Sequence, residues 1–533
     1  MSKLIIYDTT LRDGAQTEGI SFSSVDKLKI AKKLDAFGVD YIEGGWPGSN
    51  PKDMEFFNEA KNDQWQHAKI SAFGSTRRVN SLVKKDENIE LLLQAETPVV
   101  TIFGKTWDLH VTEGLRTTLK KNLQLIYESI AYLKEQGKEV IYDAEHYFDG
   151  FFDNPDYALQ TLEAAQKGGA DCLVLCDTNG GTMPRQANEV FKQTQDAGFG
   201  IPLGIHAHND TDMAVANSLI AIEKDIFHIQ GTMNGYGERC GNANLCSIIP
   251  NAVYKCDKDL QTDAKLSELT KLSRYISETA NLPHRENAPY VGNSAFAHKG
   301  GIHVSAIKRN RRTYEHIDPE AVGNHQRILV SDQAGQSNVL HKAQEMGLEL
   351  SDKDDVKAVV NRLKELEHLG YQFEDALGSF EVMIHKTTGK HKDFFELKSA
   401  RVTIDKHETG DLYSEAVMKV SVDGIIEHTA AEGNGPVDAL DKALRKALEP
   451  FYPTLKDMKL RDYKVRVLNS NVGTAAKVRV FIESEDENMV WGTVGVSENI
   501  IEASWQALVD RITYKLMREE MHVPPTPDET IIA

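Results

Sequence analysis

Two histidines separated by one residue give the chain its clearest chemical signal. His206 and His208 follow directly after the apolar run at 201–205. Side chains alternate between the two faces of a β-strand, so residues i and i+2 point the same way. Two imidazoles on one face of a stiff strand can bind one divalent metal ion together. The spacing predicts a metal site at the end of a buried strand, with a chance pair of polar residues as the alternative.

Two further residues are suited to complete this metal site. Asp13 offers a hard carboxylate oxygen and Asn242 a neutral amide oxygen, and each follows a strand-like run. Two nitrogen and two oxygen ligands suit Mn, Co, Zn or Mg and leave coordination positions open for a substrate. A 2-oxo acid can fill those positions through its carboxylate and carbonyl, and the cation then polarises the carbonyl. These residue types predict Lewis-acid chemistry on a carbonyl compound.

Arg12 and Glu43 provide the second element of carbonyl chemistry. Arg12 stands directly before the expected ligand Asp13, and a guanidinium is suited to stabilise a developing alkoxide. Glu43 ends a strand-like run, and we expect it to hold Arg12 through a bidentate pair. The same two residues would equally form a structural ion pair inside a barrel, and the sequence leaves that alternative open.

A repeating pattern of strands and helices must position these residues. Apolar, β-branched runs alternate with amphipathic segments such as 24–37 and 119–136 through the first half of the chain. The expected strands are 4–7, 41–43, 69–73, 99–103, 139–143, 171–176, 203–208 and 226–231. Eight strand–helix units over about 250 residues predict an α/β fold of the (β/α)8 TIM barrel type, with a doubly wound open sheet as the alternative. In a barrel, the C-terminal strand ends with their reactive residues meet at one mouth.

The remainder of the chain follows a different pattern. Residues 1–275 are assigned to the barrel and 276–394 to helical subdomains, and from 395 to 533 the chain is β-rich and repeats itself. Val-Asp-Ala at 437–439 and Ile-Glu-Ala at 501–503 each begin a helix after a pair of strands, so the repeat is 64 residues long. A βββα unit duplicated in this way predicts a separate α+β domain with pseudo-symmetry.

Composition narrows the class of protein. The 533 residues carry a formal net charge of −19, which disfavours binding to the phosphate backbone of nucleic acid. No apolar run approaches the roughly 18 residues that span a bilayer. The first residues show neither a basic segment nor a cleavage site typical of a signal peptide. We therefore expect a cytoplasmic protein that has neither a nucleic-acid nor a membrane partner.

Taken together, the motifs resemble those of the DRE-TIM metallolyase superfamily. That name refers to an Asp, an Arg and a Glu, which match Asp13, Arg12 and Glu43. The segments 8–16, 206–210 and 235–242 are similar to the 2-isopropylmalate, homocitrate and citramalate synthase group, and 43–51 is most similar to its citramalate branch. The resemblance covers essentially the whole chain and implies a catalytic barrel, helical subdomains and a C-terminal regulatory domain.

The resemblance also implies roles for single residues. Glu145 on strand five and His303, which would reach the partner subunit's barrel, are the candidates for the general base. Asp143 stands near Glu145, so we expect like-charge coupling to raise the pKa of one of the two carboxyls. Tyr314 matches a helper tyrosine of the group. The implied site residues are Arg12, Glu43, Glu145, Thr178 and His303 for catalysis, Arg12, Thr178, Gln16, Phe73 and Phe103 for substrate binding, and Asp13, His206, His208 and Asn242 for the metal.

The implied reaction is a Claisen-type condensation of acetyl-CoA with pyruvate, which gives (R)-citramalate and CoA on a threonine-independent route to isoleucine. Bulky side chains at Phe73 and Phe103 favour pyruvate. The alternatives are a 2-isopropylmalate or homocitrate synthase, a lyase with the same barrel, and a sensor without activity. The resemblance further implies a homodimer. We expect isoleucine or leucine to act as feedback effector on the residues from 395 onward, where 433–435 and 471–476 offer accessible backbone amides.

Overall fold

The computed structural model describes residues 3–260, 263–329, 336–348, 350, 352–406, 408, 410–468 and 476–521. The chain divides into two compact units, Met1–Phe296 with His316–Gln326, and Ala297–Glu315 with Arg327–Ala533. Among the described helices, none combines the length and the apolar character that crossing a membrane requires.

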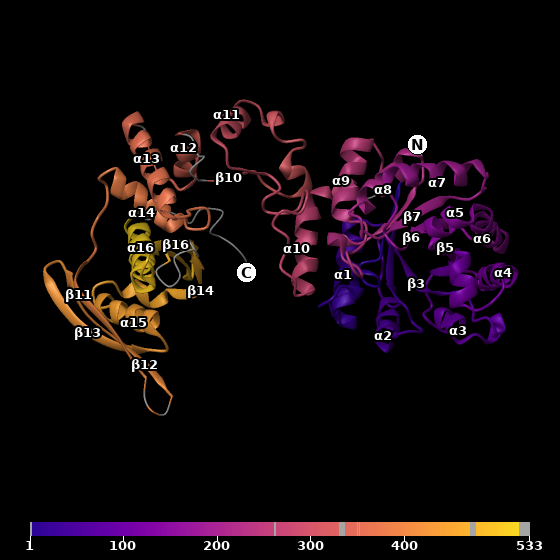
Figure 1. Ribbon diagram of the computed structural model, residues 1–533, viewed down its shortest axis with the longest axis horizontal. Helices are drawn as coiled ribbons and strands as arrows, with labels where there is room; N and C mark the ends of the chain where they lie inside the picture. Colours follow the sequence, from indigo (N-terminus) through magenta and orange to yellow (C-terminus); the bar gives the residue numbers. More distant parts are fainter. Residues whose placement is uncertain are drawn as a thin grey trace. The chain divides into compact units, whose positions relative to one another are not determined.

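A closed barrel of eight parallel strands forms the first unit (Figure 1), which confirms the predicted TIM barrel and excludes the open sheet. The strands follow one another in sequence order, and β1 closes the barrel by pairing with both β2 and β8. Their bounds are Ile5–Asp8 (β1), Tyr41–Gly45 (β2), Lys69–Ser75 (β3), Val99–Lys105 (β4), Glu139–Glu145 (β5), Cys172–Asp177 (β6), Leu203–Ala207 (β7) and His228–Gly231 (β8).

Helices cover the outside of the barrel between successive strands. They are α1 (Ser24–Phe37), α2 (Pro51–Ala60), α3 (Glu87–Gln94), α4 (Leu119–Glu135), α5 (Tyr147–Asp153), α6 (Pro155–Gly168), α7 (Pro184–Asp196) and α8 (Ala214–Glu223), followed by α9 (Leu245–Cys256) and α10 (Leu269–Thr279). The start of α1 shows a local cause: the Ser23 hydroxyl accepts the N–H of Asp26, and the Asp26 carboxylate accepts the N–H of Ser23. Apolar side chains of these helices and strands share one core.

Aromatic rings fill part of the barrel interior. The ring of His228 lies 5.3 Å from that of Tyr7 and 5.8 Å from that of Tyr41, centroid to centroid. Burial lowers the pKa of His228 to about 3, so the imidazole is neutral in the folded protein near pH 7.

The second unit begins with helices and a small sheet. The helices are α11 (Gly301–Arg309), α12 (Gln336–Glu345), α13 (Lys353–Leu369) and α14 (Leu377–Thr387). Strands β9 (Ala297–His298) and β10 (Arg327–Ile328) pair in parallel, and the sequence did not predict this pair. Otherwise the expected helical character of this region is confirmed.

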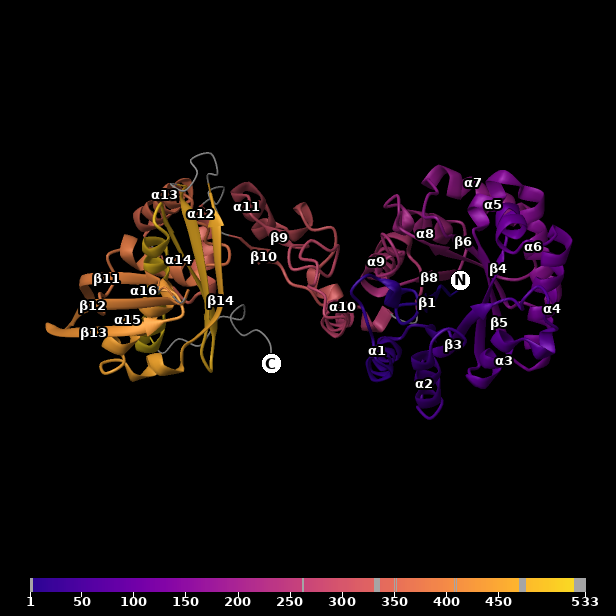
Figure 2. The same cartoon turned by 60° about the horizontal axis from the view of Figure 1, so that its bottom comes forward.

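Two copies of a βββα module complete the second unit, as the 64-residue repeat predicts. The first copy holds β11 (Glu396–Lys406), β12 (Leu412–Val422), β13 (Ile425–Gly433) and α15 (Pro436–Leu448), and the second holds β14 (Lys459–Val467), β15 (Val478–Glu485), β16 (Val490–Ser497) and α16 (Ile500–Met521). Each sheet is antiparallel with its strands in sequence order. Figure 2 shows β11, β12 and β13 side by side in the first sheet. Buried side chains from both sheets and both helices form a common core.

Protonation of His228 should contribute to unfolding in acid. Its folded-state pKa of about 3 lies below the value of about 6.5 for an unfolded histidine. The neutral ring therefore favours the folded state above pH ~6.5, and this contribution is lost as the pH falls from ~6.5 toward ~3. We expect His228→Phe to reduce the loss of unfolding free energy between pH 7 and pH 4.5 by about 3 kcal/mol.

Urea unfolding of both proteins at the two pH values measures this difference. The matched control is His67→Phe, because His67 is exposed. An equal loss in the His228 variant and the unchanged chain would contradict the prediction.

Candidate metal centre and active site

The four expected metal ligands come from three strand ends at the barrel mouth. Asp13 follows β1, His206 lies on β7 with His208 directly after that strand, and Asn242 follows β8. Ligand atoms of Asp13, His206 and His208 lie within 4.8 Å of one another, and all three residues are buried. Asn242 Nδ2 lies 3.1 Å from Asp13 Oδ2 and 3.2 Å from His206 Nε2. The fold therefore brings all four residues together.

An unsatisfied oxygen in this cluster fits a bound cation. Asn242 Oδ1 is buried without a hydrogen-bond partner among the described residues. The Asn242 amide turns its nitrogen toward the other ligands, and exchanging its N and O positions would present the orphaned oxygen to a cation. Two imidazole nitrogens, a carboxylate and an amide oxygen form a donor set that suits Mn, Co, Zn or Mg. The cluster thus has the chemistry of a divalent metal site.

The electrostatics of the site prepare its ligands for a metal. Burial acts to raise the pKa of Asp13, but Arg12 and the two histidines hold this pKa well below its usual range. Burial lowers the pKa of His208 to about 4, so this ring is neutral near pH 7. Burial also acts to lower the pKa of His206, but the hydrogen bond to Asp13 and its negative charge raise it.

Gln230 of β8 holds His206 from the side opposite to the other ligands. Its Oε1 lies 2.8 Å from His206 Nδ1, and its Nε2 donates to Asp143 Oδ1 at 3.0 Å. With Nδ1 as the donor, the Nε2 lone pair faces Asp13 and Asn242, which is the orientation that a metal ligand needs. Gln230 was not predicted from the sequence; the signal for it was a polar residue inside the expected strand 226–231, which the structure shows to be buried throughout β8.

Arg12 lies between two buried carboxylates. Its Nε donates to Glu43 Oε1 at 2.6 Å, and its Nη1 lies 3.1 Å from Asp13 Oδ2. The expected bidentate pair with Glu43 is wrong, because Glu43 Oε2 accepts the Tyr7 hydroxyl at 2.5 Å instead. Glu43 Oε1 also accepts the Thr9 hydroxyl at 2.5 Å. Two hydroxyls of β1 and its loop therefore fix the carboxylate that orients Arg12.

Three aromatic rings form a wall beside Arg12. Its guanidinium carbon lies 3.7 Å from the centroid of the Phe73 ring, which is a cation–π contact. Phe73 and Phe103 stack with their centroids 5.4 Å apart, and Trp46 meets both rings edge-on at 5.9 and 5.6 Å. No role for Trp46 was predicted from the sequence, although the residue lies in the segment 43–51 that resembles the citramalate branch. This wall, which we call the aromatic wall, limits the space next to the guanidinium.

Three other expected site residues also follow C-terminal strand ends. Glu145 ends β5 and forms an ion pair with Lys105 of β4. Thr178 follows β6, and its Oγ1 accepts the backbone N–H of His146 at 2.9 Å, so the hydroxyl proton is directed elsewhere. Gln16 is exposed in the 3₁₀ turn after β1. Their roles in catalysis and substrate binding stay predictions.

The pKa of Asp143 is raised, but not by the coupling to Glu145 that was expected. Burial raises the pKa of Asp143 to about 7, and the negative charge of Glu43 adds to this effect. The like charge is thus Glu43 on β2 rather than the neighbouring Glu145. The reason is that Asp143 accepts a hydrogen bond from Gln230 inside the barrel, whereas Glu145 pairs with Lys105.

His303 belongs to the second unit and lies on α11. Its ring stacks on that of Tyr314 with the centroids 4.1 Å apart, and both side chains are exposed. The two residues therefore form a pair within their own unit, while their catalytic roles stay predictions. Of the glycine-rich segments expected to bind an effector, 433–435 joins β13 to α15, and residues 471–475 lie outside the described residues.

Comparisons with known proteins cover nearly the whole chain. Residues 3–276 match the HMGL-like family, 290–370 the homocitrate synthase post-HMGL domain-like family, and 376–516 the LeuA allosteric (dimerisation) domain. The chain is 56% identical to the (R)-citramalate synthase of Aquifex aeolicus over 97% of this chain and 98% of that protein. It is also 56% identical to the Geobacter sulfurreducens (R)-citramalate synthase (98% and 99% covered) and 52% identical to that of Synechocystis sp. (97% and 96%).

Gln230→Leu should weaken metal binding while leaving the fold intact. Leucine keeps most of the volume but removes the acceptor that fixes the His206 ring. Such outer partners of a metal ligand typically account for about 10–100-fold in affinity. Calorimetric titration of chelator-treated protein with MnCl₂ measures the change.

Two further variants serve as the positive and the negative control for this measurement. His208→Ala removes a ligand and should bind Mn²⁺ more weakly still, whereas Gln193→Leu, at an exposed position of α7, should bind like the unchanged chain. Unaltered affinity in Gln230→Leu would show that the hydrogen bond does not orient the ligand.

Proposed function

The chain belongs to the (R)-citramalate synthases of the HMGL-like family, and from that premise we propose that its barrel condenses acetyl-CoA with pyruvate to give (R)-citramalate and CoA. The observation that carries the proposal is the 56% identity to two such enzymes along almost the full length of each. Arg12 and the four clustered ligands argue against a sensor without activity. The duplicated C-terminal modules argue against a simple lyase, which has little need of a regulatory domain.

Asp13, His206, His208 and Asn242 would hold the divalent cation, with Mn, Mg, Co and Zn as candidates. When bound, a cation of this kind polarises a carbonyl oxygen, which is worth several kcal/mol of transition-state stabilisation. Gln230 keeps the His206 ring oriented, and the low pKa of His208 keeps that ring unprotonated near neutral pH.

Arg12 stabilises the charge that forms during carbon–carbon bond formation. The methyl carbon of acetyl-CoA, after losing a proton, attacks the ketone carbon of pyruvate, and the ketone oxygen becomes an alkoxide. A guanidinium fixed in advance by Glu43 needs no reorganisation to meet this charge, which is the property that makes such donors effective.

Proton transfer and hydrolysis complete the reaction. Glu145 and His303 are the two candidates for the base that takes the methyl proton, and such help is worth about 10²–10⁴-fold. The Thr178 hydroxyl donates its proton to the carboxylate of pyruvate. Water then attacks the thioester carbonyl, the carbon–sulfur bond breaks, and CoA leaves as the thiol.

The C-terminal region would make the enzyme responsive to its pathway. Residues 376–516 match an allosteric dimerisation domain, which supports a homodimer that is inhibited by a branched-chain amino acid. Isoleucine, or else leucine, is the effector we propose, because citramalate would feed a threonine-independent route to isoleucine. The boundaries at 275 and 394 are proposed limits of barrel, helical subdomains and regulatory domain.

A thiol-release assay with acetyl-CoA and several 2-oxo acids tests the reaction. We expect the highest kcat/KM with pyruvate, no CoA release after exhaustive chelation, and recovery when Mn²⁺ is added back. A comparable kcat/KM for 2-oxoisovalerate would assign the chain to the 2-isopropylmalate synthases instead.

Phe103→Ala should broaden the choice of acceptor by opening the aromatic wall. A pocket that fits a methyl group discriminates against each added methylene by about 1–3 kcal/mol. We therefore expect the ratio of kcat/KM for 2-oxobutyrate to that for pyruvate to rise roughly tenfold or more. Phe152→Ala, at an exposed position of α5, is the matched control and should leave the ratio unchanged. If the ratio moves in neither variant, the aromatic wall does not set specificity.

A further inference from the structure

The residue that follows the candidate base Glu145 has a strained backbone. His146 adopts φ 57° and ψ 35°, in the left-handed region that residues with a side chain seldom occupy. Its N–H donates to Thr178 Oγ1 at 2.9 Å. Strained conformations of this kind persist where the surrounding structure enforces them, and they concentrate at functional sites. The turn at His146 therefore connects the end of β5 to the hydroxyl that is proposed to meet pyruvate.

The imidazole of His146 is held on three sides. Its Nδ1 lies 2.9 Å from Asp149 Oδ2 in the first turn of α5. The His110 ring meets it edge-on with the centroids 4.2 Å apart, and the Trp107 ring lies 5.7 Å away. Only 10% of the His146 side chain is exposed. A ring enclosed in this way keeps one orientation, and it holds the Cα atom to which it is attached.

Helix α5 carries Asp149 to the ring because it packs closely against the segment that follows β4. A Cβ atom on Gly150 would lie 2.5 Å from the backbone oxygen of Thr106, so this approach requires glycine. Trp107 Nε1 also donates to Asp153 Oδ2 at 2.6 Å. The carboxylate that holds the imidazole thus stands on a helix that is itself fixed against the end of β4.

Rotation about a single bond relates the held ring to the Thr178 contact. The φ angle of His146 describes the N–Cα bond, which joins the planar peptide with the N–H to the Cα with the ring. Fixing the ring therefore limits the directions that the N–H can take. Thr178 Oγ1 accepts this N–H, and Arg239 Nη2 donates to the Thr178 carbonyl at 2.8 Å. With its oxygen and its backbone both held, the Thr178 hydroxyl has few directions left for its own proton.

We propose that His146 is a positioning residue for the 2-oxo acid. Its imidazole, held by Asp149, keeps the backbone N–H on Thr178 and so directs the Thr178 hydroxyl proton toward the carboxylate of pyruvate. The imidazole acts through Thr178 and exchanges no proton with substrate. This inference rests on the condensation proposed above and adds the means by which one contact with the acceptor is oriented.

Steady-state kinetics with each substrate varied in turn test the role of the imidazole. A hydrogen bond to a charged group is worth about tenfold or more in affinity. We expect His146→Ala and Asp149→Ala each to raise KM for pyruvate about tenfold, with KM for acetyl-CoA and kcat changed less than about twofold. Asp149→Asn keeps an oxygen that accepts from Nδ1 and should restore most of the pyruvate affinity. An unchanged KM for pyruvate, or equal changes in both KM values, would overturn the proposal.

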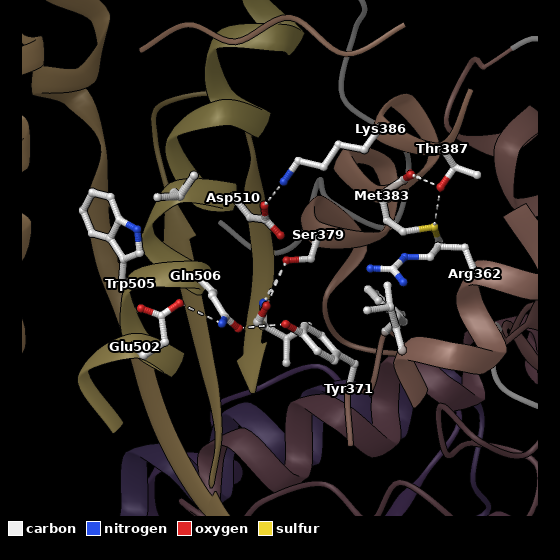
Figure 3. A pocket seen from close by; sticks show the side chains of 14 residues that line it. Arg362, Tyr371, Ser379, Met383, Lys386, Thr387, Glu502, Trp505, Gln506 and Asp510 are labelled. Atoms are coloured by element: carbon white, nitrogen blue, oxygen red, sulfur yellow. Dashed lines mark hydrogen bonds and ion pairs between the residues drawn. The ribbon is translucent and has the colours of Figure 1, made fainter. Parts of the chain in front are cut away.

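Thr178→Val decides whether His146 acts through the hydroxyl. Valine keeps the shape of threonine without its hydroxyl, so KM for pyruvate should rise, and His146→Ala should add less than about twofold in that background. Additive effects would overturn the proposal. The matched control is Thr387→Val in the second unit, which should leave KM unchanged. The Thr387 hydroxyl also makes a hydrogen bond, to the Met383 carbonyl at 2.7 Å, beside a pocket of about 500 Å³ (Figure 3).

Two further readings separate this inference from the proposed function. Calorimetric titration with MnCl₂ should give the same affinity for His146→Ala as for the unchanged chain, which shows that the barrel mouth is intact. If His146→Ala does not fold, Asp149→Ala carries the same test with His146 in place. An unaltered KM for pyruvate in Thr178→Val would overturn this inference but leave the condensation standing. Absence of CoA release from the unchanged chain with pyruvate would overturn both.

Discussion

The barrel mouth depends on the balance of buried charge around Arg12. Glu43 is fully buried, Asp13 is 3% exposed and Arg12 is 12% exposed, and the guanidinium contacts both carboxylates. Removing one partner from a buried ion pair leaves an uncompensated charge and costs about 3–5 kcal/mol. The three side chains therefore hold one another in place. The Arg12 guanidinium, which is proposed to stabilise the developing alkoxide, is already oriented before substrate binds.

Asp13 belongs to this charge balance and to the metal centre at once. One of its oxygens, Oδ2, lies 3.1 Å from Arg12 Nη1 and 3.2 Å from His206 Nε2. A carbonyl compound bound at the ligand cluster is consequently close to the guanidinium as well. The sharing explains why the chain places an arginine and a metal ligand side by side in sequence: one short turn after β1 delivers both groups to the same side of the mouth.

Local patterns allowed much of this to be predicted. The histidine spacing and the polar strand ends indicated the ligands and the barrel, because a strand has a period of two and parallel strands end together. The hydrogen-bond partners of Glu43 were not predictable from the sequence. Its Oε2 was expected to accept from Arg12 but accepts the Tyr7 hydroxyl, because β1 and β2 are neighbouring strands. The role of Gln230 could not be predicted either, because it depends on the contact with His206 on the neighbouring strand β7. The first strand of each module was not located, because β11 and β14 are mostly exposed and lack a buried–exposed alternation.

Because β1 pairs with β8, the metal-ligand cluster can assemble only after the last strand of the barrel has been translated. Asp13 and Asn242 are 229 residues apart in the chain. At about 5–20 residues per second, a ribosome needs roughly 10–50 s to make the stretch between them. Throughout that interval the nascent barrel has two open edges, whose unpaired backbone groups can join those of another chain. Pairing of β8 with β1 closes the sheet and brings Asp13 next to the other three ligands. The metal ligands therefore assemble at the place where the barrel closes.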